Sequence, residues 1–257
     1  MKPDLEFAAE LATRAGKVLA SNFRRDPELL NLRRTAKGIT TRYDEASDEL
    51  IVNAISEEYP SHNIWTEETG IVDKGSEYTW IADPLDGTTN FASGNPLFCV
   101  TIALLKKKEP VLGVTYAPAI GELYTAEKGK GAFLNGERIS VSTTERLEEC
   151  YVYFCEGGDR NRVRTRRVNC AIYPRVKDLR KLGSAGLEAA WVACGRGDAY
   201  ATTKIEPWDI AASVLIVEEA GGKVTDFKGN TWRAERSDIV FSNGRIHEHI
   251  LEIVRDL

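Results

Sequence analysis

Apolar positions repeat along the chain with two different periods, and each period predicts a type of element. From residue 4 to 23, Leu5, Ala8, Ala12, Ala15 and Leu19 recur at helical spacing, which predicts an amphipathic helix. A second helix is predicted over 40–59, where the pattern ends at a proline. Further helices are predicted over 187–194, 207–220 and 245–257. The predicted helices therefore lie mainly in the first 60 and the last 70 residues of the chain.

Strand patterns occupy the middle of the chain. Strands are predicted over 99–105, 111–116, 123–127 and 131–134, separated by turn signals, of which Asn135-Gly136 is the clearest. These strands form an antiparallel meander, and shorter strands are predicted over 63–65 and 78–82. After residue 142 strands at 150–155 and 198–202 alternate with helices, one of them in the basic segment 159–172. We predict an α/β protein with an N-terminal half, 1–142, and a C-terminal half, 143–257.

Composition narrows the class of protein. At 257 residues and 42% hydrophobic content, the chain can bury a large core as one domain or two fused ones. No apolar run approaches the roughly 20 residues that span a bilayer, and no basic-then-apolar leader begins the chain, which predicts a cytoplasmic protein. Five cysteines without a Cys-x-x-Cys pair predict mostly buried, reduced thiols. A net charge of -5 argues against nucleic acid as the main partner.

Candidate chemistry concentrates where the strand 78–82 ends. Asp83 follows the strand, Pro84 is expected to end ladder pairing and fix a bend, and Asp86 precedes a turn at Gly87, after which Thr88 can open a short helix. Two carboxylates beside a helix N-terminus favour a divalent cation and the phosphate that it neutralises. An isolated Asp-x-x-Asp-Gly is more often a solvated turn, so the motif needs support from the rest of the chain.

The wider sequence supplies this support. The run Asp83-Pro-Leu-Asp86-Gly-Thr88-Thr-Asn90-Phe resembles the metal-binding signature of the inositol monophosphatase family. About 120 residues later, Pro207-Trp208-Asp209-Ile-Ala211 resembles the family's Trp-Asp-x-Ala motif, and Trp65-Thr-Glu67-Glu68-Thr resembles its Gly-Glu-Glu segment. The resemblance covers nearly the whole chain. It implies an αβαβα sandwich of the inositol monophosphatase and fructose-1,6-bisphosphatase type, with the site between the two halves.

The resemblance also implies a set of metal ligands. They are Glu67, Asp83, Asp86, Asp209 and the carbonyl of Leu85, which are hard oxygen donors suited to two or three Mg²⁺ ions and not to zinc. Thr66 stands where glycine is common in the family.

The resemblance assigns catalysis to three further residues. Glu68 reaches a metal-bound water, and Asp44 pairs with Thr88 to polarise the water that attacks phosphorus directly. From the residues alone, Asp44 could also be a helix cap. An aspartyl-phosphate mechanism uses two aspartates separated by one residue, whereas Asp83 and Asp86 are separated by two.

Substrate contacts follow from the same resemblance. They are expected at residues around the turn and at a glycine-rich junction that suits an anion: Asp86, Gly87, Thr88, Gly183, Ser184, Ala185 and Asp209. Thr89-Asn90-Phe91 favours inositol monophosphate over a nucleotide 3′-phosphate, although Thr202 stands where the family has a sugar-contacting acid and Glu206 where relatives vary. The leading alternative is a dual enzyme that also hydrolyses fructose 1,6-bisphosphate, with Arg180 or the helix in 159–172 binding the second phosphate.

The expected partners are a small sugar or cyclitol phosphate and a second copy of the chain. Relatives are commonly lithium-inhibited dimers, and the family places one basic residue near the metals, here Arg33, Arg34 or Lys37. Some bacterial relatives instead act as partners of RNA polymerase or of ribosome assembly. A binding role of that class is the alternative to an enzyme.

Overall fold

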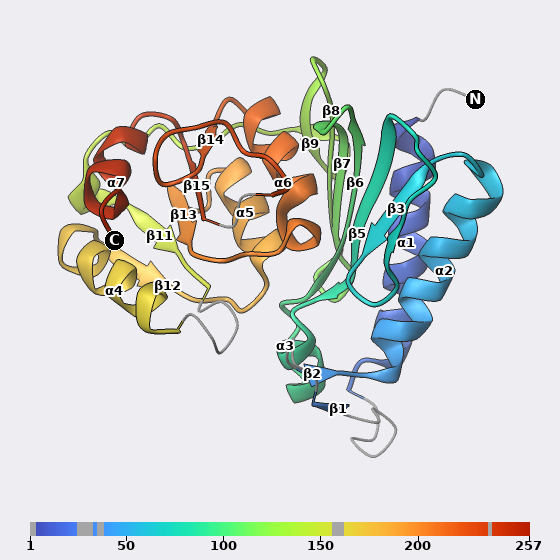
Figure 1. Cartoon of the computed structure of the whole chain (residues 1–257). Coiled ribbons are helices and arrows are strands. Elements are labelled where there is room, and N and C mark those ends of the chain that lie inside the picture. Colours follow the sequence, from blue (N-terminus) through green and yellow to red (C-terminus); the bar gives the residue numbers. More distant parts are fainter. Residues whose placement is uncertain (1–3, 25–32, 35–38, 156–161, 236–237) are drawn as a thin grey trace.

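Five layers make up the chain, in the order helix, sheet, helix, sheet, helix (Figure 1). The computed structural model describes residues 4–24, 33–34, 39–155, 162–235 and 238–257. Helices α1 and α2 cover the outer face of an eight-stranded sheet, α5 and α6 lie between the two sheets, and α4 and α7 cover the outer face of a five-stranded sheet. The predicted αβαβα architecture is confirmed.

The described helices and strands follow the predicted periods closely. The helices are α1 Leu5–Asn22, α2 Arg42–Glu58, α3 Thr88–Ser93, α4 Arg162–Ile172, α5 Ala185–Ala193, α6 Pro207–Glu219 and α7 His247–Val254. The short 3₁₀ segments are Leu147–Glu149 and Tyr173–Arg175. The strands are β1 Arg33–Arg34, β2 Ile39–Thr40, β3 Asn63–Thr66, β4 Gly70–Val72, β5 Tyr78–Asp86, β6 Cys99–Lys106, β7 Glu109–Ala117, β8 Glu122–Glu127, β9 Gly131–Leu134, β10 Glu137–Arg138, β11 Tyr151–Tyr153, β12 Asp178–Arg180, β13 Ala199–Thr202, β14 Lys223–Thr225 and β15 Ile239–Ser242.

The eight-stranded sheet brings together the ends of two strands that carry predicted site residues. Its order is β10-β9-β8-β7-β6-β5-β3-β4; β6 to β9 form the predicted antiparallel meander, and β5 and β10 extend it at its two ends. Strand β3 pairs with β5 in parallel, with Thr66 opposite Ala82. Parallel strands end at the same edge of a sheet. Glu67 directly follows Thr66 and Asp83 directly follows Ala82, so the two acids come after paired positions at that edge.

Strand β5 is longer than predicted. It continues past Ala82 to Asp86, which pairs with Cys99, and the register shifts between Asp83 and Asp86. Pro84 lies in this irregularity, where the ladder requires no N–H donor, so the bend is accommodated and the strand goes on. The Ser47 hydroxyl donates to the Pro84 carbonyl oxygen at 2.9 Å, which attaches the bend to α2.

Helix α6 lies in the centre of the molecule. It is buried on nearly all sides between the sheets, and it crosses β7 so closely that a Cβ on Gly113 would lie 2.5 Å from the carbonyl oxygen of Ala212. The surrounding core cluster contains residues from both sides of the predicted 142/143 boundary, for example Ile81 and Leu187. A division into halves therefore stays a prediction.

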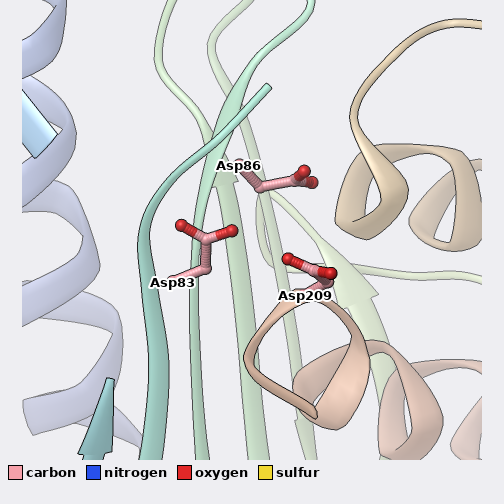
Figure 2. Close-up of side chains that lie close together, drawn as sticks. All are labelled: Asp83, Asp86 and Asp209. Carbon is pink, nitrogen blue, oxygen red and sulfur yellow. The ribbon is translucent and has the colours of Figure 1, made fainter. Parts of the chain in front are cut away.

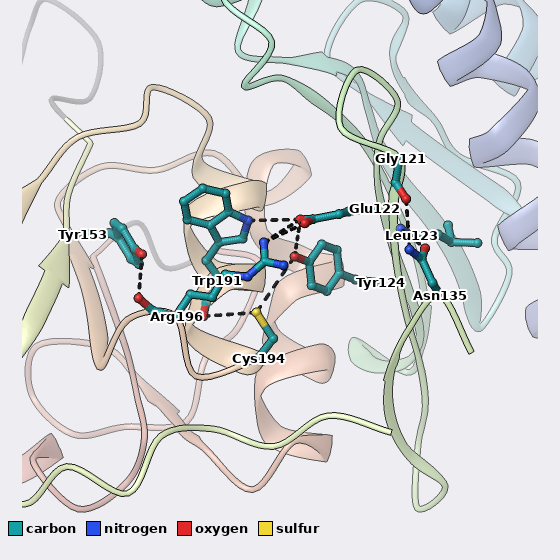
Figure 3. Close-up of polar contacts among 9 residues, drawn as sticks. All are labelled: Gly121, Glu122, Leu123, Tyr124, Asn135, Tyr153, Trp191, Cys194 and Arg196. Carbon is teal, nitrogen blue, oxygen red and sulfur yellow. Dashed lines mark hydrogen bonds and ion pairs between the residues drawn. The ribbon is translucent and has the colours of Figure 1, made fainter. Parts of the chain in front are cut away.

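A polar cluster joins the first sheet to the C-terminal end of α5 (Figure 3). Glu122 on β8 accepts hydrogen bonds from Tyr124 Oη at 2.6 Å, from Trp191 Nε1 at 3.3 Å and from Arg196 Nη1 at 2.7 Å. The Arg196 guanidinium lies 5.2 Å from the centre of the Trp191 ring. Helix α5 is thus attached to the eight-stranded sheet at this end.

Two other predictions concern composition. All five cysteines are free; Cys99 and Cys150 are buried, Cys155 and Cys194 are half-buried, and Cys170 is exposed. Among the described helices, none combines the length and apolar character that crossing a membrane requires.

Candidate active site

Three aspartates meet between the first sheet and α6 (Figure 2). Asp83 and Asp86 come from the end of β5, Asp209 comes from the first turn of α6, and one carboxylate oxygen of each lies within 4.8 Å of the others. Asp83 is 2% exposed and Asp86 is 7% exposed. The structure therefore brings together three of the predicted metal ligands, of which Asp83 and Asp209 are 126 residues apart in the sequence.

The aspartates destabilise one another's charged forms. Burial raises the pKa of Asp83 well above its usual range, and the charges of Glu67, Asp209 and Asp86 raise it further. Burial, followed by the charges of Asp86 and Glu67, does the same to the pKa of Asp209. Buried acids with only oxygen donors fit a hard divalent cation such as Mg²⁺, whose charge would offset this repulsion.

Glu67 and Glu68 lie in the three-residue turn between β3 and β4, and both are half-buried. The two side chains have different surroundings. Glu67 acts on the pKa values of Asp83 and Asp209, although it is not part of the group within 4.8 Å. Glu68 lines an acidic hollow beside α2. This difference agrees with the expectation that adjacent residues face opposite ways.

Thr66 supports this turn from inside the sheet. Its hydroxyl oxygen accepts a hydrogen bond from Thr69 N at 3.2 Å, and the Thr69 hydroxyl donates to Asp48 Oδ2 on α2 at 2.5 Å. The threonine that departs from the family's glycine thus closes the turn through its own side chain.

Asp44 and Thr88 form the predicted pair. The Thr88 hydroxyl lies 3.0 Å from Asp44 Oδ1 and 3.1 Å from the carbonyl oxygen of Leu85, and it can donate to either. Thr41 donates to Asp44 Oδ2 through its N–H at 2.8 Å and its hydroxyl at 2.5 Å. The cap of α2 is therefore Thr41, and Asp44 is the third helical residue of a capping box. Burial raises the pKa of Asp44 above its usual value.

Leu85 connects this pair to the aspartates. Its N–H donates to Asp83 Oδ1 at 2.9 Å, and its carbonyl oxygen lies next to the Thr88 hydroxyl. The main chain of one residue therefore contacts both the metal-ligand candidate and the catalytic candidate.

Asp86 is bound by the N-terminus of α5. Ser184 Oγ and Gly186 N each donate to Asp86 Oδ2 at 2.7 Å, and Ala185 N donates to Oδ1 at 3.2 Å. Burial raises the pKa of Asp86, and these hydrogen bonds oppose the increase. The glycine-rich junction does bind an anion, as its sequence suggests, and in this structure the anion is Asp86.

The two glycine turns lie against each other. Gly87 has φ +91°, and a Cβ there would lie 3.1 Å from the Leu97 carbonyl oxygen and 3.2 Å from Ser184 Cβ. Gly183 has φ +87°. The predicted substrate-contact residues Gly87, Thr88, Gly183, Ser184 and Ala185 thus gather around Asp86.

Sequence reasoning missed three residues of the site. Cys99 Sγ donates to Asp86 Oδ2 at 3.4 Å, and the Thr101 hydroxyl donates to the carbonyl oxygen of Trp208 at 2.7 Å. Gly186 must lack a side chain, because a Cβ would lie 2.6 Å from Thr101 Cγ2. Cys99 and Thr101 alternate in an otherwise apolar strand, so a period of two was the available signal for both.

Three carboxylates at the site lie at helix N-termini. Asp44 is in the first turn of α2, Asp209 is in the first turn of α6 and accepts Glu206 N at 3.3 Å, and Asp86 is bound by the first turn of α5. The partial positive charge at a helix N-terminus stabilises an anion. The fold therefore offsets part of the repulsion among its buried acids.

Other predicted residues lie elsewhere or outside the described residues. Thr202 is buried and donates to the Cys155 carbonyl oxygen at 3.0 Å, and Glu206 is the exposed N-cap of α6. Arg180 donates to Asp178 at 2.7 Å and lies over the Tyr151 ring. The basic helix α4 is in the outer layer, on the opposite face of the second sheet from α5 and α6. Residues 35–38 and 156–161, and the side chains of Arg33 and Arg34, are not described, so the basic residue near the metals stays a prediction.

Comparison with known proteins gives consistent matches over the full length. The sequence profile of the "Inositol monophosphatase family" matches residues 1–257. The fructose-1,6-bisphosphatase/inositol-1-monophosphatase of Thermotoga maritima is 41% identical, over 98% of this chain and 96% of its own. The Nus factor SuhB of Pasteurella multocida is 37% identical, over 99% and 97%. The solved structure of a Thermotoga maritima IMPase is similar with a TM-score of 0.89 at 40% identity, over 98% and 96%.

Proposed function

The chain belongs to the inositol monophosphatase family and is thus a phosphoric monoester hydrolase, and we propose that it hydrolyses myo-inositol 1-phosphate to myo-inositol and phosphate. The observation that carries the proposal is the group of Asp83, Asp86 and Asp209 beside the Thr88 and Asp44 pair. A metal-ion centre and a group that can accept a proton are the two parts that direct attack by water requires.

The family is metal-dependent in general, and we assign two or three Mg²⁺ ions to this site. Glu67, Asp83, Asp86, Asp209 and the Leu85 carbonyl would hold them. Bound there, Mg²⁺ would neutralise the phosphate, lower the pKa of a water molecule and stabilise the leaving alkoxide.

The protein's own contribution to the reaction is a proton path. Thr41 occupies Asp44 Oδ2, so Oδ1 is the oxygen that faces the Thr88 hydroxyl. When Thr88 donates to Oδ1, its oxygen can accept a proton from the attacking water and Asp44 receives the hydroxyl proton. Burial raises the pKa of Asp44, which makes this carboxylate a better acceptor. Glu68 is proposed to orient the same water.

Phosphate binding is assigned to the turn that follows Asp86. Gly87 precedes α3, and the first N–H groups of a helix lack partners within that helix. Gly87 lies against Gly183 and Ser184, and we propose that the ester lies against this surface and the adjacent Thr88.

A dual activity on fructose 1,6-bisphosphate is the second candidate, because the Thermotoga maritima relative carries both activities in its name. Arg180 is engaged by Asp178, and α4 is in the outer layer, so neither supports binding of the second phosphate. The Thr89-Asn90-Phe91 run still favours inositol phosphate as the substrate. We further propose a lithium-inhibited homodimer located in the cytoplasm.

The deciding experiment is phosphate release from myo-inositol 1-phosphate, fructose 1,6-bisphosphate and adenosine 3′,5′-bisphosphate. Each ester is tested with Mg²⁺, with a chelator, and with the Asp83→Asn variant. Asp178→Asn, a partly exposed aspartate on β12, is the matched control. We expect Mg²⁺-dependent turnover that only Asp83→Asn abolishes, and the best ester identifies the substrate. A wild-type protein inactive on every ester would overturn the substrate proposal.

The SuhB relatives motivate one further comparison. If the chain also acts as a binding partner of transcription machinery, a variant with both Glu67 and Asp83 changed to alanine should still capture that partner. Loss of capture in the double variant would link binding to the catalytic centre.

A further inference from the structure

Glu188 is the only charged residue of α5, and its side chain is fully buried. Eight of the nine residues of this helix are buried, and all except Glu188 are apolar or glycine. Transferring a carboxyl group from water into such surroundings costs free energy unless the group forms hydrogen bonds that repay the loss. A buried acid in this helix therefore calls for a physical explanation.

The Glu188 side chain reaches back beyond the start of its own helix. Its Oε1 accepts hydrogen bonds from Leu182 N at 2.5 Å and from Gly183 N at 3.1 Å. Both N–H groups precede the N-cap residue, Ser184. An apolar side chain at this position would leave two main-chain donors without this partner inside the protein, which is costly.

The usual capping arrangement is absent from α5. Ser184 forms no side-chain hydrogen bond to its own helix, because its hydroxyl donates to Asp86 instead. The next two N–H groups, of Ala185 and Gly186, also point to Asp86. The helix thus uses its first turn to bind a metal-ligand candidate, and Glu188 fixes the chain just before that turn.

Asn90 holds the same segment from the other side. Its Nδ2 donates to the Leu182 carbonyl oxygen at 2.8 Å, and a Cβ on Gly183 would lie 3.1 Å from that nitrogen. Leu182 and Gly183 therefore lie between an acid on α5 and an amide from the Asp-Gly-Thr-Thr-Asn run. A shift of this segment would move Ser184, and with it the Asp86 carboxylate.

We propose that Glu188 is a positioning residue for Asp86. By holding Leu182 and Gly183, it sets the first turn of α5, and that turn orients the Asp86 carboxylate for a divalent cation. The inference rests on the proposed function only in taking Asp86 as a metal ligand. Groups that hydrogen-bond a metal ligand directly typically change metal affinity or activity about 10–100-fold when they are removed, and Glu188 positions three such groups, the donors of Ser184, Ala185 and Gly186.

The test compares Glu188→Met with Glu188→Gln. Methionine has a similar length without a strong acceptor, whereas glutamine keeps an oxygen that can face Leu182 and Gly183. Mg²⁺ affinity is measured by titration calorimetry, kcat and KM are measured with myo-inositol 1-phosphate, and thermal unfolding is followed in chelator. We expect Glu188→Met to weaken Mg²⁺ binding about 10–100-fold and Glu188→Gln to stay within about threefold of wild type. If Glu188→Met does not fold, Glu188→Asp replaces it and should also weaken binding, because its carboxylate is drawn back by one methylene.

Glu122→Met is the matched control, since Glu122 holds the other end of α5 through Trp191 and Arg196. It should lower the unfolding temperature and leave Mg²⁺ affinity unchanged. Equal weakening of Mg²⁺ binding by both methionine variants would show general loosening of α5 and overturn the proposal. Unchanged Mg²⁺ binding in Glu188→Met would overturn it too, with the proposed function intact. A wild type that does not bind Mg²⁺ would overturn both.

Discussion

A single methyl group at Gly186 should disable the centre without unfolding the protein. A Cβ at this position would lie 2.6 Å from Thr101 Cγ2, 3.1 Å from Asp86 Oδ2 and 3.2 Å from the Asp209 carbonyl oxygen. Gly186 is a helical residue, so alanine introduces no backbone strain there. The effect of Gly186→Ala is therefore steric, and it falls on two of the three clustered aspartates.

The size of the effect follows from the distances. Ordinary contact begins at 3.4 Å, so the new methyl group and Thr101 Cγ2 must separate by about 0.8 Å, the difference between 3.4 and 2.6 Å. Overpacking of this kind costs about 1–3 kcal/mol, equivalent to a fall in Tm of about 2–10 °C for a chain of this size. A displacement near 1 Å in an active site costs about 100-fold in rate. We expect kcat/KM to fall about 10–100-fold.

Two further variants make the assay decisive. Thr101→Ser removes the opposing methyl group and keeps the hydroxyl that donates to Trp208, so combining it with Gly186→Ala should recover part of the activity. Gly16→Ala creates a similar clash, 2.5 Å from the Tyr116 ring, in the outer helix layer. It should reduce Tm and leave kcat/KM unchanged. Full activity in Gly186→Ala, or an equal loss in Gly16→Ala, would refute the reasoning.

Three other predictions concern the catalytic pair, a buried histidine and a strained turn. Thr88→Val should reduce kcat about 10²–10⁴-fold and Thr88→Ser only slightly, because only the hydroxyl connects water to Asp44; phosphate release at saturating substrate checks this. His247 is fully buried between the hydroxyls of Thr225 and Ser242, and burial, with Lys223, lowers its pKa from 6.5 to about 4. The unfolded chain therefore protonates this imidazole more readily than the folded protein does, and about 3 kcal/mol of stability is lost as pH falls from 6.5 to 4. His247→Gln should remove that part of the loss, which urea unfolding at the two pH values measures. An identical pH dependence in the variant would contradict the assignment. Lys107 and Lys108 have φ +51° and +71°, a conformation that asparagine and glycine adopt with less strain. Lys107→Asn combined with Lys108→Gly should therefore stabilise the protein by about 1 kcal/mol in the same assay. A loss of stability would show that the exposed ion pairs of the two lysines matter more than the strain.

Local sequence patterns predicted helices, strands and turns well where the backbone preferences of neighbouring residues determine them. Asn135-Gly136 forms the expected turn with both residues at positive φ, and Gly87 opens α3 as expected. The turn at Lys107-Lys108 also has two residues at positive φ but lacks the glycine signal, and both lysines form exposed ion pairs. Sequence could place the strand and predict its turn, but not the continuation of β5 beyond Pro84, which depends on pairing with Cys99.

The site shows the same limit. Asp83, Asp86 and Asp209 were predictable from short motifs, and the structure brings them together. The donors to Asp86 from Ser184, Ala185 and Gly186 are about 100 residues away in sequence, so no local pattern could reveal that they bind a carboxylate. The role of Glu188 could not be predicted either. It lies in an otherwise apolar helix, and its hydrogen-bond partners, Leu182 and Gly183, precede that helix.

Helix α5 contacts the first sheet at both ends, through Asp86 and through Glu122, so the acidic centre cannot be complete until this helix has been synthesised. Residues 1–142 leave the ribosome first and already contain Glu67, Asp83 and Asp86. Asp209 and the three α5 donors to Asp86 arrive later, together with the Arg196 contact to Glu122. A nascent chain therefore carries repelling acids with no completed ligand set. If the acids bind Mg²⁺ as proposed, the full ligand set forms only after the residues beyond 142 have packed against the first sheet, so cation binding would report that the chain has folded.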